Sequence, residues 1–169
     1  MFWGGNFIPA MTTLIRRECF DRVGVYDENL FYEDWDMWLR ISQSYEFAYS
    51  EKVAAKYRLV STSMVRSQWP RLVDAMCQMC VKHLKGGQLD AASRRIASKK
   101  LHAMAAISFQ QKSIRHKKNL LDAMRYRPTF GILARCVLAS CGGGDEQFEA
   151  MRSIFRGRKL PMGAHQPTK

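Results

Sequence analysis

The feature that most constrains the fold is an uninterrupted helical stripe of apolar residues near the middle of the chain. Between residues 69 and 85 the apolar positions recur every three or four residues, as on one face of a helix: Leu72, Val73, Met76, Cys77, Cys80, Val81 and Leu84. Pro70 suits the first turn of a helix, and Gly86-Gly87 ends the pattern. The stripe predicts a long helix with one buried face.

Similar patterns predict four further helices after this one. They cover about residues 89–111, 119–127, 129–140 and a last segment capped by Asp145. We therefore expect residues 67–158 to form an all-α region of helical hairpins. The polar, proline-bearing residues 159–169 are expected to be a loose tail.

The residues before this region predict a mixed structure. Short alternating runs at 10–15, 45–49 and 53–60 are typical of strands, whereas 17–23 and 34–44 have helical spacing. Gly24 is suited to ending the first of these helices. The expected fold class is therefore α+β for residues 1–66, followed by the all-α region.

Charge divides the chain at nearly the same place. The 169 residues contain 27 Lys and Arg against 15 Asp and Glu, a formal net charge of +12. Residues 1–63 carry −2 and residues 64–169 carry +14. The basic region either binds an anionic membrane surface or is simply a solvated face. A nucleic-acid partner is not expected, because the sequence holds no groove-fitting motif.

Cysteine usage indicates a reducing compartment, and hydropathy indicates a chain that does not span a membrane. The five cysteines are an odd number, and Cys77 and Cys80 lie on the apolar stripe without a second pair to complete a zinc site. We interpret them as buried, reduced thiols. Since no run reaches the roughly 18 apolar residues of a membrane span, we expect a cytoplasmic protein, peripheral at most to the inner membrane face.

Three carboxylates within four positions are the strongest candidates for chemistry. Glu33, Asp34 and Asp36 lie between aromatic residues at the start of a predicted helix. A carboxylate beside apolar walls can act as a general base. The alternative is that Glu33 and Asp34 only cap the helix and that Asp36 is solvated.

The flanking residues resemble a known family. Its pattern matches, in order and spacing, the following segments: Asn6, Leu14-Ile15-Arg16-Arg17-Glu18-Cys19-Phe20, Val23-Gly24-Val25-Tyr26-Asp27-Glu28-Asn29-Leu30, Tyr32-Glu33-Asp34-Trp35-Asp36-Met37-Trp38-Leu39-Arg40 and Tyr57-Arg58. The series resembles the second, acceptor-side half of the family-two glycosyltransferases, which have the GT-A fold. The resemblance covers about residues 4–66 and implies that 1–66 is the acceptor-side half of such a domain.

The resemblance also implies roles for individual residues. Asp34 would be the base that deprotonates the acceptor hydroxyl, and Glu33 would bind the acceptor or tune Asp34. Trp35 would stack on a sugar ring, with core packing as its alternative. Asn6 would contact substrate, and Arg58 would lie near the nucleotide diphosphate. Asp36 and Arg40 are four residues apart, which predicts an ion pair on the helix surface.

The implied reaction is an inverting transfer of sugar from a nucleotide-diphosphate donor to a glycan or lipid-linked acceptor. A divalent metal, Mg²⁺ or Mn²⁺, would neutralise the diphosphate. Residues before Asn6 do not supply the family's nucleotide-binding half, and no Asp-x-Asp metal motif occurs in that context. This chain is therefore expected to be incomplete and inactive alone. The alternative is a non-catalytic basic helical binding module that carries a degenerate glycosyltransferase remnant.

Overall fold

The structure, a computed structural model, describes residues 5–58 and 60–155, and the regular secondary structure in them is all helical. A 3-10 turn, η1 (Ala10–Thr12), is followed by α1 (Arg17–Val23), α2 (Glu33–Ile41) and α3 (Met64–Ser67). The longer helices are α4 (Trp69–Lys85), α5 (Ala91–Gln110), α6 (His116–Tyr126), α7 (Phe130–Ser140) and α8 (Asp145–Phe155). The tail expected at 159–169 lies outside the described residues.

The expectation of an α+β fold is wrong, because no strand occurs in residues 5–58 and 60–155. The run 10–15 holds η1, and 45–49 is irregular. The run 53–58 is also irregular, and Leu59 lies outside the described residues. Alternating apolar residues form a strand only when a neighbouring strand takes up their backbone N–H and C=O groups. The described residues provide no such neighbour, so these segments connect helices instead.

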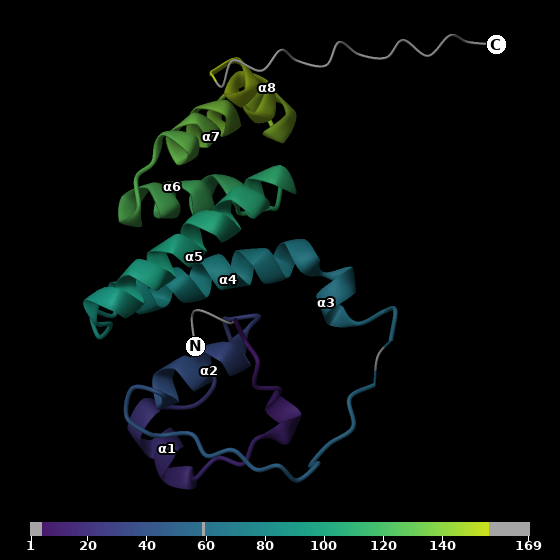
Figure 1. Ribbon diagram of the computed structural model, residues 1–169, viewed down its shortest axis with the longest axis vertical. Helices are drawn as coiled ribbons and strands as arrows, with labels where there is room; N and C mark the ends of the chain where they lie inside the picture. Colours follow the sequence, from purple (N-terminus) through teal and green to yellow (C-terminus); the bar gives the residue numbers. More distant parts are fainter. Residues whose placement is uncertain (1–4, 59, 156–169) are drawn as a thin grey trace, which may run out of the picture.

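Helices α4 to α8 form a stack in which successive helices lie against one another (Figure 1). Two of their starts carry side-chain caps. Asp90 accepts a hydrogen bond from the Ser93 backbone N–H (2.7 Å), and Thr129 accepts one from the Ile132 N–H (3.3 Å). Gly87, with φ +72°, makes the turn after α4 in a conformation that other residues rarely adopt. The five helices predicted after residue 66 are thus present.

One continuous apolar core joins α2 to this stack. Trp35 and Leu39 of α2 pack with the stripe of α4, including Leu72, Met76 and Cys80. Side chains from the helices above complete the cluster: Leu101, Phe109, Leu120, Ile132 and Phe148. The predicted burial of Cys77 and Cys80 is confirmed.

The opposite face of α2 packs against a second, smaller core. Met37, Trp38 and Ile41 contact Cys19 of α1 and partly buried residues of the chain before and after it. Six of the nine residues of α2 are buried. A helix that is covered on all sides behaves as a central core element, and Figure 1 shows α2 lying between α1 and α4. The start of this helix is where the candidate base lies.

Among the described residues, no helix is long and apolar enough to cross a membrane.

Candidate functional site

The carboxylate of Asp34 lies at the start of α2 and is held by two hydrogen bonds. Its Oδ2 accepts from Asn6 Nδ2 at 2.9 Å, and its Oδ1 accepts from the Trp35 backbone N–H at 2.6 Å. Asp34 is half-buried, so the carboxylate is fixed and still reachable from solvent. Asn6 and Asp34 are 28 positions apart in the sequence and are in direct contact. Both are residues that the family resemblance singles out.

Two tyrosines, Tyr26 and Tyr32, lie near enough to this carboxylate to feel its charge, a feature that the sequence did not single out. Burial raises the pKa of Tyr32, and the negative charge of Asp34 and the proximity of Tyr57 raise it further. Burial also raises the pKa of Tyr26, with further contributions from the charges of Asp34 and Glu33. These phenols stay protonated at neutral pH. They can donate hydrogen bonds beside the acidic pair.

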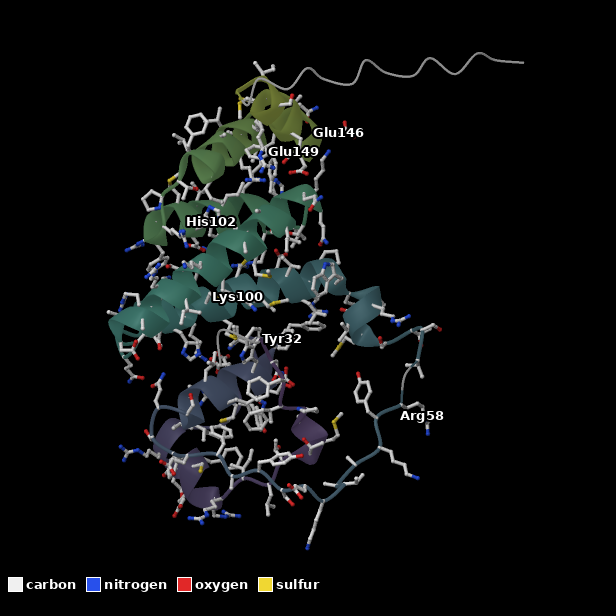
Figure 2. All side chains as sticks on the ribbon, viewed as in Figure 1. Tyr32, Arg58, Lys100, His102, Glu146 and Glu149 are labelled. Carbon is white, nitrogen blue, oxygen red and sulfur yellow. The ribbon has the colours of Figure 1, made fainter. Side chains whose placement is uncertain are left out.

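Trp35 lies beneath this site and is almost fully buried, with 2% of its surface exposed. Its ring packs edge-to-face against Tyr32, with centroids 5.5 Å apart, and Lys100 Nζ lies 5.0 Å from its ring centroid. Figure 2 shows Lys100 on α5 and Tyr32 below it, beside α2. In this conformation the indole is part of the core, as one of its two sequence interpretations expected.

Glu33 and Arg58 occupy more open positions. Glu33 is exposed on the first turn of α2. Arg58 is exposed on the long connector between α2 and α3, on the stretch that leads to α3 and away from α2 (Figure 2). The structure thus brings Asn6, Asp34 and Trp35 together, whereas Arg58 is not in contact with them.

Asp36 is the centre of a buried ionic network. Its Oδ2 accepts hydrogen bonds from Arg40 Nε and Lys82 Nζ, both at 2.9 Å, and its Oδ1 is 3.0 Å from His83 Nε2. The predicted Asp36–Arg40 ion pair is confirmed, but its expected place on the surface is wrong, because Asp36 is 0% exposed. Periodicity could not reveal this burial, since both partners on α4 are distant in sequence.

The network sets the charge state of Asp36 and positions the backbone. Burial alone would raise the pKa of Asp36, but hydrogen bonds from His83 and Lys82 and the charges of Lys82 and Arg40 outweigh burial and lower it to about 2. The guanidinium of Arg40 also donates to the carbonyls of Val23 and Val25, which fixes the connector from α1 to α2. Asp36 is therefore an ionised structural centre and not a second base.

A second buried polar cluster joins α4, α5 and α6. Asp74 Oδ1 accepts hydrogen bonds from Ser108 Oγ (3.1 Å), Ser113 Oγ (2.7 Å) and Asn119 Nδ2 (2.6 Å). All four residues are at most 4% exposed. Sequence reasoning missed this cluster, because a lone Asp in an apolar stripe has no local signature. Its hydrogen bonds are satisfied internally, which is typical of a structural role.

An open groove of about 1250 Å³ lies on the other side of α2 from Trp35. The segments 7–16 and 44–55 line it, with Trp38 and Ile41 among the residues of α2 that contribute. Neither Glu33 nor Asp34 is among its lining residues. The groove is thus separate from the candidate base.

The described residues do not fit the divalent metal that the resemblance implies. Within 5–58 and 60–155, no three His, Cys, Asp or Glu side chains are grouped so that they could hold a metal ion. The carboxylate of Asp36 is engaged with three cationic or imidazole groups, as described above. No step is therefore assigned to a metal on these residues.

Comparison with known proteins gives one family. Residues 3–86 match the family described as glycosyltransferase like family 2. Neither the curated proteins nor the solved structures give a match. The resemblance read from the sequence is confirmed: residues 3–86 are a glycosyltransferase-like family 2 segment. The match runs through α4, which supplies Lys82 and His83 to the buried network.

Proposed function

We propose that this protein takes part in an inverting glycosyl transfer from a nucleotide-diphosphate sugar to an acceptor hydroxyl. The family match supports a glycosyltransferase-type protein. The observation that carries the finer proposal is the carboxylate of Asp34, oriented by Asn6 at 2.9 Å and by its own helix start. A fixed, half-buried carboxylate beside aromatic walls suits a general base.

In the proposed reaction, Asp34 accepts the proton of the acceptor hydroxyl as that oxygen attacks the anomeric carbon of the donor. The bond from the anomeric carbon to the nucleoside diphosphate breaks, and the diphosphate leaves with the bonding electrons. Asn6 keeps Oδ2 in place during this step, because its amide donates to that oxygen. The phenol of Tyr32 would donate a hydrogen bond to the bound acceptor.

Replacing the base tests this proposal directly. In an assay of sugar transfer, Asp34→Asn should lower turnover at least about 100-fold, the usual contribution of a general base. Asp21→Asn, an exposed substitution on α1, is the matched control and should keep normal turnover. Near-normal sugar transfer by Asp34→Asn would show that the base is another residue.

We also propose that the basic stack docks on an anionic membrane surface through α6. Its outward residues Lys117, Lys118, Leu121 and Arg125 are all exposed and share one helix face. Ile114, in the preceding turn, is 97% exposed, and Leu121 is 64% exposed. Cations around exposed apolar side chains suit an interfacial surface, where lysines contact headgroups and apolar groups enter the acyl boundary.

Sedimentation with phosphatidylserine–phosphatidylcholine vesicles tests the membrane proposal. The chain should bind these vesicles, release at high salt, and bind phosphatidylcholine alone weakly. A Lys117→Gln/Lys118→Gln variant and a Leu121→Ser variant should each bind less, whereas Lys99→Gln on α5 should bind normally. Equal losses in all three variants would indicate general charge attraction and would overturn the assignment to α6.

A further inference from the structure

Two cations of the basic stack lie over aromatic rings at either end of the segment that carries Glu33 and Asp34. The guanidinium carbon of Arg71, on α4, is 4.2 Å from the centroid of the Phe31 ring. Lys100 Nζ, on α5, is 5.0 Å from the centroid of the Trp35 ring. Lys100 comes from outside the family-matched residues. The stack therefore contributes positive charge to both flanks of the acidic pair.

Lys100 is the more deeply placed of the two cations. Its side chain is half-buried, and the ion pairs among the described residues do not include it. Gly5 lies beside it, since a Cβ at that position would be 3.7 Å from Lys100 Nζ and 3.9 Å from Trp35 Cη2. A partly desolvated ammonium without a carboxylate partner favours an anionic ligand.

Trp35 gives a second, independent sign of a missing partner. Its indole Nε1 is buried, and no described residue accepts its hydrogen bond. Buried donors in folded proteins nearly always have an acceptor, so an orphan donor needs an explanation. A ligand oxygen that reaches this nitrogen would supply that acceptor.

These groups adjoin the candidate base through the chain itself. Gly5 packs beside Lys100 and Trp35, and the next residue, Asn6, donates to Asp34. Trp35 also follows Asp34 directly and donates its backbone N–H to the same carboxylate. An anion bound at Lys100 would thus lie next to the segment that positions Asp34.

We infer that Lys100 and Trp35 form a binding site for a phosphate or carboxylate group of the acceptor substrate. The inference rests on the proposed function, because it names the acceptor of that reaction as anionic. Arg71, which is exposed and lies over Phe31, adds a second cation near the acidic pair. The stack then contributes to substrate choice as well as to stability.

Titration of the chain with glucose 6-phosphate, with glucose as the neutral comparison, tests the inference. The readout is the Trp35 indole N–H signal in a proton–nitrogen correlation spectrum. Glucose 6-phosphate should shift this signal saturably, and glucose should not. Lys100→Met should weaken binding at least about tenfold, a loss typical of removing a charged contact. Lys99→Met, its exposed neighbour on α5, should bind within about twofold of wild type.

Further arms separate the possible failures. Lys100→Arg keeps the charge and should keep binding. The dispersion of the Lys100→Met spectrum shows whether that variant is folded. Absence of a saturable shift, or equal binding by Lys100→Met, would overturn the site. Lys100-dependent binding of uridine diphosphate without binding of glucose 6-phosphate would place the anion on the donor and overturn the acceptor assignment.

The titration needs no sugar transfer, so its result is independent of the activity assay. If the protein transfers no sugar while phosphate binding depends on Lys100, the proposed function fails and the acceptor assignment fails with it. If transfer depends on Asp34 but phosphate binding is absent, only the inference about Lys100 fails.

Discussion

Lys82 Nζ on α4 lies 2.9 Å from Oδ2 of Asp36 on α2, and Asp36 is fully buried. The same ammonium is 2.7 Å from Asp27 Oδ2 on the connector between α1 and α2. Lys82 therefore links the stack, through two ion pairs, to the segment that carries the candidate base. The ion pair crosses the boundary that the sequence predicts at residue 66, and it lies inside the family-matched residues 3–86.

Removing the buried carboxylate should destabilise the protein strongly. Asp36→Asn leaves Lys82 and Arg40 without their shared anion, and loss of one partner of a buried ion pair costs about 3–5 kcal/mol. Urea unfolding followed by circular dichroism measures the change in the free energy of unfolding. Asp21→Asn, exposed on α1, should change it by less than about 0.5 kcal/mol. A cost below about 1 kcal/mol for Asp36→Asn would show that the network is not needed for stability.

The same carboxylate should make stability depend on acid pH. Its pKa is lowered from 3.8 to about 2 in the folded protein. Its contribution is therefore complete above the unfolded pKa and is lost as the pH falls from about 4 to about 2. A shift of this size corresponds to about 2 kcal/mol. Urea unfolding of wild type and Asp36→Asn across this range checks it. Their difference should shrink toward low pH, and a constant difference would contradict the assignment.

The stack should depend on its central leucine. Leu101 of α5 is 0% exposed in the core that joins α4, α5 and α6. Leu101→Ala removes buried apolar atoms and leaves a cavity, which costs about 2–5 kcal/mol. Thermal and urea unfolding give the value. Leu133→Ala on α7, where the side chain is 51% exposed, is the matched control and should cost less than about 1 kcal/mol. A loss of stability in Leu101→Ala as small as that in Leu133→Ala would contradict the prediction.

The helices were predictable because their signals are local. The stripe from Leu72 to Leu84 and the glycines at 86–87 predict a helix that ends where α4 does, and Asp145, the predicted cap, is the first residue of α8. The strands were wrongly predicted, because a strand at 53–60 needs backbone partners from elsewhere in the chain. Alternation alone cannot report whether those partners exist.

The candidate site shows the same division between local and distant information. The motif around Asp34 gave the acidic pair and Asn6, and the structure joins Asn6 to Asp34. Lys82 and His83 around Asp36 are brought in by tertiary packing, as is Lys100 beside Trp35. A single sequence gives no signal for such pairs, because their separations follow no helical or strand period.

The cysteines should differ sharply in reactivity toward a thiol reagent. Burial raises the pKa of Cys80 to about 12, and burial, with smaller contributions from neighbouring groups, also raises that of Cys77. The thiolate is the reactive form, so both should be inert in the native protein. Cys141 is exposed after α7 and should react first. Labelling with an aromatic disulfide at neutral pH should give one fast thiol, which Cys141→Ser removes and Cys80→Ser retains. A fast phase lost in Cys80→Ser would instead identify the Cys77–Cys80 pair as a reactive site.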